Sequence, residues 1–298
     1  MSKRLLFCTG EGIGNTIQCI PVVRTLVEVL GYDVDVWHAF GSYNTPKIIP
    51  YCDKWIIGNQ IQQINPNNYK GLVSTFWTRD YAKHMFLKLL SRIYALSMSR
   101  SEVDTYMQIA RDLGVEEKDL IWHGECLYSN TNNNDKYDVV IHDGYNRYGS
   151  ADWSVKSYSR YSEVALKLKE AGFRVCSVGN EREYIEDTDN MTGFDLLTTF
   201  GMIKKCKLFL GNDSGLYHAA NALNVRNIVI FTATSIEKNF DSRFHKYSTI
   251  MGRDDLECRP CQAGRGWKNC KTWECRNIDP QIIYEKAMEM LNGNNRDS

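Results

Sequence analysis

The stretch that decides the fold runs from Leu208 to Leu223 and reads LFLGNDSGLYHAANAL. Its apolar start predicts a buried strand over 207–210, and the small residues over 218–223 predict a helix. Between them lies a Gly-Asn-Asp-Ser-Gly turn. A strand, a glycine-containing turn and a helix in this order are typical of open α/β sheets. Ligands of such sheets bind at the carboxyl ends of the strands.

This turn concentrates groups that bind phosphate. Glycine lets the backbone approach a ligand closely, and the N–H groups at a helix start favour an anion. Ser214 adds a hydroxyl, and His218 adds an imidazole that either donates to the ligand or packs in the core. We expect Asp213 to orient the turn by bonding its N–H groups. The alternative is an ordinary capped turn. The predicted diphosphate site comprises Asn212, Asp213, Ser214, Gly215 and His218.

The composition is that of an ordinary soluble globular protein. The 298 residues are 43% apolar, and 36 basic residues balance 36 acidic ones. This balance argues against a protein that depends on long-range attraction to nucleic acid or anionic lipid. No apolar run approaches the roughly 18 residues that would span a membrane. The apolar run near the start is too short for a signal peptide, so we expect a cytoplasmic protein, of a bacterium or of a host cell if viral.

Strands alternate with helices along the sequence, which predicts an α/β fold with parallel sheets flanked by helices. The polar run SNTNNND at 129–135 is the expected linker between two domains. We expect a Rossmann-like domain over 1–130, a second one over 136–279, and a C-terminal helix and tail over 280–298. The two parallel sheets would face a central cleft.

Several motifs resemble those of glycosyltransferase family 9, the heptosyltransferase-like enzymes. The signature is the turn and helix described above, and its lead-in also matches. Three further segments extend the resemblance over nearly the whole chain: Gly12-Ile13-Gly14-Asn15-Thr16-Ile17, Lys156-Ser157-Tyr158 and Val178-Gly179-Asn180-Glu181.

The resemblance implies a GT-B fold, with two Rossmann-like domains, and transfer of a sugar from a nucleotide-diphosphate sugar to a hydroxyl acceptor. Its defaults are ADP-heptose as donor and a lipopolysaccharide-core glycan as acceptor. No cofactor or divalent metal is expected to be required. Helix N–H groups, Ser214 and Lys156 would stabilise the leaving diphosphate instead. Gly179 joins the donor side, and Gly12, Ile13 and Gly14 form the acceptor-side loop.

One departure from the family leaves the catalytic base open. Heptosyltransferases carry an aspartate, thought to deprotonate the acceptor hydroxyl, where this chain has Asn15. An amide has no useful basicity, so Asn15 can only orient the acceptor. Glu11, on the same loop, is the first candidate for the base. Asp143, at the end of a strand in the second domain, is the next.

Other functions stay open. The acceptor could be a hydroxylated base in DNA, as in phage DNA modification, and nucleic acid is then a partner. The missing aspartate also fits a non-catalytic relative that binds nucleotide or glycan. A Rossmann oxidoreductase is a minor alternative, because Gly10-x-Gly12 only partly matches a dinucleotide fingerprint.

Four of the ten cysteines cluster near the C-terminus with the spacing C-x2-C-x8-C-x4-C. Four thiolates so close in sequence could close a structural zinc site. Free thiols and a redox-labile disulfide are the alternatives, and the other six cysteines are expected to be buried free thiols. The clustered residues are Cys258, Cys261, Cys270 and Cys275.

Overall fold

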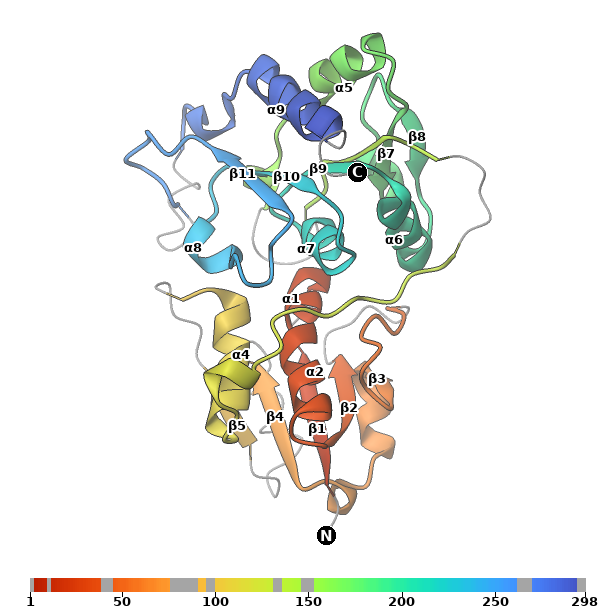
Figure 1. Cartoon of the computed structure of the whole chain (residues 1–298), viewed down its shortest axis with the longest axis vertical. Helices are drawn as coiled ribbons and strands as arrows, with labels where there is room; N and C mark the ends of the chain where they lie inside the picture. The colour runs from red at the N-terminus through yellow and green to blue at the C-terminus, as the bar shows by residue number, and fades with distance from the viewer. Residues whose placement is uncertain are drawn as a thin grey trace. The chain divides into compact units, whose positions relative to one another are not determined.

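A computed structural model describes residues 3–9, 12–38, 45–75, 91–94, 100–130, 136–145, 153–261 and 270–293. The chain divides into two compact units (Figure 1). The first comprises residues 1–127 and 237–244, and the second comprises 128–236 and 245–298. Each unit is built on one parallel sheet, so the predicted α/β class with two parallel sheets is confirmed.

The sheet of the first unit has five parallel strands in the order β3-β2-β1-β4-β5. The chain builds β1 to β3 toward one edge and then returns past β1 to build β4 and β5. The order therefore reverses between β1 and β4. The strands are β1 (Arg4–Thr9), β2 (Asp33–His38), β3 (Trp55–Ile57), β4 (Gly71–Thr75) and β5 (Ser91–Tyr94).

The helical segment that follows β1 is divided in two at Cys19. Pro21 lies in the first turn of the second helix, where its missing N–H removes no helical hydrogen bond. The helices and 3-10 turns of this unit are α1 (Ile13–Gln18), α2 (Ile20–Glu28), η1 (Gly58–Gln63), η2 (Pro66–Asn68), α4 (Glu102–Asp112) and η4 (Glu117–Asp119).

The sheet of the second unit has six parallel strands in the order β11-β10-β9-β6-β7-β8. Here the order reverses between β6 and β9, which pair so that His142 lies opposite Gly211. The strands are β6 (Val139–His142), β7 (Val175–Gly179), β8 (Asp189–Thr192), β9 (Leu208–Asn212), β10 (Asn227–Phe231) and β11 (Ser248–Gly252).

Helices cover this sheet, and α5 lies beside α9 (Figure 1). Ile283 and Ala287 of α9 are buried in one core cluster with Val164 and Leu168 of α5. The terminal helix is thus part of the second unit's core and not a separate element, unlike the predicted division at 280. The helices and turns are η5 (Ser154–Lys156), α5 (Tyr161–Glu170), η6 (Glu181–Glu183), α6 (Leu196–Lys205), α7 (Gly215–Ala222), η8 (Glu274–Arg276) and α9 (Pro280–Asn292). A short helix, α8 (Ile236–Asn239), begins at the last residue of this unit before segment 237–244 and continues into that segment.

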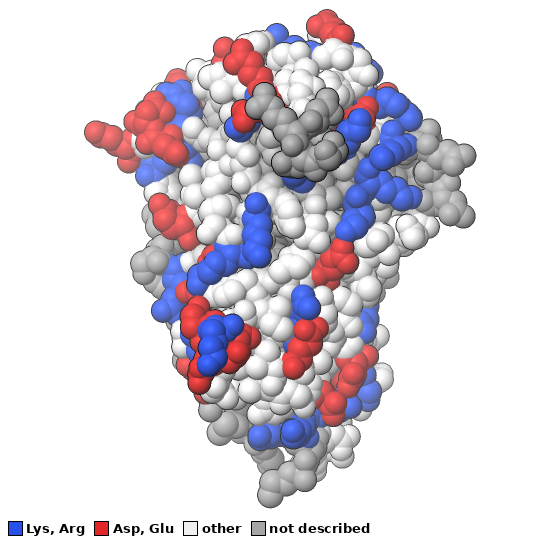
Figure 2. Space-filling model, in the orientation of Figure 1, with Lys and Arg blue, Asp and Glu red and all other residues white. Residues whose placement is uncertain are grey.

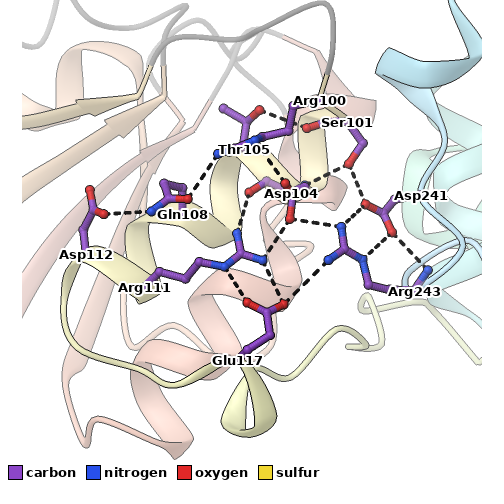
Figure 3. Close-up of polar contacts among 10 residues, drawn as sticks. All are labelled: Arg100, Ser101, Asp104, Thr105, Gln108, Arg111, Asp112, Glu117, Asp241 and Arg243. Carbon is purple, nitrogen blue, oxygen red and sulfur yellow. Dashed lines mark hydrogen bonds and ion pairs between the residues drawn. The ribbon is translucent and has the colours of Figure 1, made fainter.

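The sequence predicts that residues 136–279 all belong to the second domain. In the structure, segment 237–244 belongs to the first unit. Arg243 holds this segment through Nη2, which lies 3.0 Å from Asp104 Oδ1 on α4 and 2.7 Å from Asp241 Oδ2. Its guanidinium also lies 3.6 Å from the ring centroid of Trp122. Ser101 donates to the same Asp241 carboxylate at 2.7 Å, and Figure 3 shows these polar contacts.

Acidic and basic side chains are interspersed over much of the face drawn in Figure 2, as the balanced composition leads one to expect. Within the described ranges, no helix combines the length and the apolar character needed to cross a bilayer.

Candidate active site

The sequence signature lies at the place where the strand order of the second unit reverses, between β6 and β9. In open parallel sheets a crevice forms at such a point, outside the carboxyl ends of the strands. Three strands end there or next to it, β6 at His142, β9 at Asn212 and β7 at Gly179. The predicted strand, turn and helix are present, although the helix begins at Gly215 rather than His218.

Ser214 occupies the N-cap position of α7, but its side chain makes no capping hydrogen bond. Its hydroxyl instead lies 3.1 Å from His142 Nδ1. A serine at this position usually accepts a hydrogen bond from the N–H of the second or third helical residue. Because Ser214 does not, its hydroxyl leaves the N–H groups at the start of α7 without the usual N-cap bond.

Lys156 and Asp213 form a largely buried ion pair at this turn. Lys156 Nζ donates to Asp213 Oδ2 at 3.0 Å and to the Asp213 main-chain oxygen at 2.9 Å. Asn212 Nδ2 donates to the Lys156 carbonyl at 3.1 Å, so the two segments are joined in both directions. The lysine predicted for the donor site is therefore adjacent to the signature turn. Its charge is compensated by Asp213, so what it can offer a ligand is chiefly one further directed N–H.

Asp143 supports the segment that carries Lys156. One carboxylate oxygen accepts from Ser157 Oγ at 2.7 Å, and the other accepts from the Tyr158 N–H at 3.0 Å. Burial raises the pKa of Asp143 to about 6, although these two hydrogen bonds favour the ionised form. With both oxygens engaged in fixing residues 157 and 158, the geometry favours a positioning role over the role of a general base.

His218 is buried, and its Nδ1 lies 2.9 Å from His245 Nε2. Tyr217 stacks on the His245 ring with centroids 4.9 Å apart. Burial, with a smaller contribution from the Lys156 charge, lowers the pKa of His218 to about 3. The imidazole is therefore neutral near pH 7. Of the two roles considered for it, this environment favours packing over donation to a phosphate.

His142, which the motifs did not single out, lies beside Ser214 and next to Glu183, which accompanies the Val178-Gly179-Asn180-Glu181 motif. His142 Nε2 is 3.3 Å from Glu183 Oε2, and the same oxygen accepts the Asn180 N–H at 2.9 Å. Gly179 makes room for them, because a Cβ there would lie 2.3 Å from Glu183 Oε2. Its φ of +130° also disfavours other residues. The sequence signal was the Asn180-x-x-Glu183 capping box, which is present.

Two buried polar atoms near these strand ends have no hydrogen-bond partner among the described residues. They are Asn212 Oδ1, at the end of β9, and Thr234 Oγ1, shortly after the end of β10. Buried polar atoms are nearly always paired with protein or water. Their position at the carboxyl edge of the sheet fits a site that a polar ligand or ordered water completes.

The acceptor-side loop predicted in the first unit leads into α1. Asn15 Nδ2 donates to Glu102 Oε1 at 2.6 Å, and Gln18 Nε2 donates to Glu102 Oε2 at 3.0 Å. An ionised carboxylate only accepts hydrogen bonds, so Glu102 fixes which way the Asn15 amide points. Gly12 is needed because a Cβ there would lie 2.9 Å from Asn15 Oδ1. Ile13 and Gly14 form the first turn of α1, and Glu11 lies outside the described residues.

All four clustered cysteines are free thiols. Cys261 Sγ lies 3.3 Å from the Cys258 carbonyl, and Cys270 Sγ accepts the Trp273 N–H at 3.4 Å. In the part of the chain that the structure describes, which omits 262–269, no three His, Cys, Asp or Glu side chains are arranged to hold a metal ion. The geometry of Cys258, Cys261, Cys270 and Cys275 thus gives no support to the expected zinc site.

A basic cavity lies at the other end of the strands of the same sheet, where their amino ends are. Part of its charge has a structural use, since Lys204 Nζ donates to the Leu223 carbonyl at the end of α7 and Lys207 pairs with Asp138 at 2.8 Å. Cations are favourable beside the carboxyl end of a helix. The basic residues that line the cavity are Lys136, Lys204, Lys205, Lys207 and Arg226.

Comparison with known proteins agrees with this architecture. The model of the family described as glycosyltransferase family 9 (heptosyltransferase) matches residues 70–266. No match was found among curated proteins.

Several solved structures share the fold. ADP-heptose lipopolysaccharide heptosyltransferase II of E. coli is 17% identical with a TM-score of 0.72, over 98% of this chain and 99% of that one. A family 9 glycosyltransferase of Veillonella parvula is 15% identical with a TM-score of 0.70, over 98% of each chain. The iron-containing dodecameric glycosyltransferase TibC of enterotoxigenic E. coli is 12% identical with a TM-score of 0.66, over 97% of this chain and 78% of that one. These likenesses establish the GT-B fold.

Proposed function

The chain belongs to glycosyltransferase family 9, the heptosyltransferase family, and we propose that it transfers a sugar from a nucleotide-diphosphate sugar to a hydroxyl acceptor. The observation that carries this proposal is the uncapped start of α7 beside Lys156, at the strand-order reversal of the second unit. The N–H groups and the partial positive charge at a helix start favour a phosphate at this position.

The chemistry requires that negative charge on the leaving diphosphate be stabilised as the glycosidic bond to the donor breaks. Backbone N–H groups of Gly215 and its neighbours, with an N–H of Lys156, are preorganised for this task. Each such donor typically lowers the barrier by about 3 kcal/mol. Because these groups act without a divalent ion, we expect turnover to persist in chelator.

The names of similar proteins support ADP-heptose as the default donor and a lipopolysaccharide-core glycan as the default acceptor. The comparisons give no support to a nucleic-acid acceptor. A cytoplasmic location, where nucleotide sugars are made, is part of this proposal. For the base we retain Glu11, with Asn15 orienting the acceptor hydroxyl through an amide that Glu102 holds in place.

The test is turnover of ADP-heptose, followed as ADP release with and without a lipopolysaccharide-core acceptor, in EDTA. Lys156→Met should lower kcat/KM by about 10²–10³, because it removes a directed N–H donor at the diphosphate. Lys167→Met, on the outer part of α5 where Nζ lies 6.0 Å from the Tyr284 ring centroid, is the matched control and should leave the rate unchanged.

Undiminished turnover by Lys156→Met would overturn the placement of the diphosphate. Activity that is lost in EDTA and restored by Mg²⁺ or Mn²⁺ would contradict metal-independent stabilisation. Binding of ADP without any turnover or hydrolysis of nucleotide sugars would instead favour the non-catalytic alternative.

A further inference from the structure

Ser214, His142 and Glu183 form a line of three hydrogen-bonded side chains at the proposed diphosphate site. Ser214 Oγ is 3.1 Å from His142 Nδ1, and His142 Nε2 is 3.3 Å from Glu183 Oε2. The His142 and Glu183 side chains are only 7% and 5% exposed. Water therefore has little access to the ring, and the proton positions on it are dictated by these two neighbours.

With one proton on the ring, the direction of each hydrogen bond is fixed. An ionised carboxylate only accepts, and Glu183 Oε2 already accepts the Asn180 N–H, so His142 Nε2 carries the ring proton and donates to it. Nδ1 is then a bare acceptor. The Ser214 hydroxyl must donate to Nδ1, and it presents only lone pairs to a ligand.

A phosphate diester at Ser214 also presents only lone pairs. It can bind favourably to the hydroxyl only if Ser214 turns its proton outward, which requires that Nδ1 carry a proton and donate to Oγ. That state has one more proton on the pair, either on a cationic His142 or on a Glu183 carboxyl that donates to Nε2. We propose that the His142–Glu183 pair switches Ser214 between acceptor and donor, and that the donor diphosphate binds together with one proton taken up by this pair.

The charged groups around His142 come from each neighbouring element. Glu183 on η6 and Asp143, the residue directly after β6, favour a cation, and His142 in turn favours ionisation of Asp143. The Lys156–Asp213 pair, from η5 and the turn after β9, contributes opposite charges that largely cancel. Gly179 on β7 adds none. The arrangement can therefore hold the extra proton when an anion arrives.

The proposal makes His142 a positioning residue for the donor and rests on the proposed function. Its consequence is a pH-dependent affinity. Wherever the free pair lacks the extra proton, each unit of pH should weaken binding about tenfold, because the proton must be taken from solvent. A nucleotide-diphosphate sugar is a suitable probe, since a phosphate diester lacks the second phosphate ionisation near pH 6.

The experiment is calorimetric titration of the full chain with ADP-heptose between pH 5.5 and 8.5, in two buffers of different ionisation enthalpy. We expect uptake of up to one proton per ligand bound at the alkaline end. Ser214→Ala should bind about as well as wild type at pH 8.5 and about 10-fold more weakly at pH 5.5, with reduced proton uptake. Ser162→Ala, a half-buried serine on α5, is the matched control and should follow wild type throughout.

A constant ratio of wild-type to Ser214→Ala affinity across this pH range would overturn the proposal, as would binding without proton uptake. Both outcomes would still be compatible with binding of the nucleotide-sugar donor at this site. Failure of wild type to bind ADP-heptose at any pH would instead remove the proposed function on which the inference rests.

Discussion

Two buried glutamates, one in each unit, have carboxylates that accept hydrogen bonds from quite different donors. Glu102 accepts from the Asn15 and Gln18 amides and from the Tyr106 hydroxyl at 3.2 Å. Amides do not titrate, and burial raises the pKa of Tyr106 well above its ordinary value. Glu183 accepts from a backbone N–H and pairs with His142, whose imidazole can carry one proton or two.

The comparison indicates that the role of a buried carboxylate depends on the groups that donate hydrogen bonds to it. With donors that keep their protons, Glu102 holds the Asn15 amide in one orientation. With a histidine as partner, Glu183 belongs to a pair whose proton count can change, so the hydroxyl beyond it can change from acceptor to donor. The two glutamates are equally buried, so burial alone does not distinguish these roles.

The largest effect is expected from Asn15→Asp, which tests the contrast between Glu102 and Glu183 and also restores the family's residue. It would place a second carboxylate within hydrogen-bond distance of Glu102, where Asn15 Nδ2 is now 2.6 Å away. The shared proton should raise the pKa of the new pair in the folded state. Its contribution to stability is then present at low pH and lost as pH rises. We expect a loss of about 2–4 kcal/mol at pH 8 and less at pH 5, measured by urea unfolding.

Asn15→Ala is the control for that experiment. It removes the amide donor without adding charge, so it should cost about 1–2 kcal/mol equally at both pH values. If Asn15→Asp and Asn15→Ala lose the same stability at pH 5 and at pH 8, Glu102 does not contact residue 15 as the structure shows.

A smaller effect is expected at Asp143, the carboxylate next to His142. Burial raises its folded-state pKa to about 6, above an unfolded value near 3.8. A raised pKa gives stability that is fully present below about pH 4 and is lost as pH rises through 6. In wild type, this effect should lower the free energy of unfolding by about 2 kcal/mol between pH 4 and pH 7. Asp143→Asn should lack that decrease, which urea unfolding at each pH would measure. If the free energy of unfolding changed with pH in the same way in wild type and in Asp143→Asn, the raised pKa of Asp143 would be refuted.

The smallest effect should come from a carboxylate in solvent. Arg160 Nε lies 2.7 Å from Glu163 Oε1 in an exposed pair at the start of α5. Water screens such pairs, so Arg160→Gln should change the free energy of unfolding by about 0.5 kcal/mol or less at every pH. A cost above about 1 kcal/mol would mean that close ion pairing, rather than burial, sets the energetics of the carboxylates compared above.

The local parts of the site could be predicted from the sequence because their signals are local. The strand, turn and helix from Leu208 to Ala222 follow from apolar and small residues at fixed spacing, and the lysine at 156 follows from a motif. Glu102 and His142 could not be found in this way. Glu102 bonds to a residue 87 positions earlier, and His142 bonds to a serine 72 positions later.

The segment 237–244 illustrates the same limit for the fold. Its eight residues lie between two elements of the second unit along the chain, yet Arg243 and Asp241 bind α4 of the first unit (Figure 3). Charge and spacing along the sequence contain no signal for this, because the partners Asp104 and Ser101 are about 140 residues away.

By itself the sequence determined the α/β class, the two parallel sheets and the position of the turn proposed to bind phosphate, since hydrophobic periodicity and turn residues act over a few positions. Only the tertiary structure decided which groups meet at that turn. It turned the Ser214 hydroxyl away from its helix and toward His142, compensated Lys156 with Asp213, and buried His218 in its neutral form. Proton positions and pKa values depend on burial and on partners brought together from distant strands, which folding alone supplies.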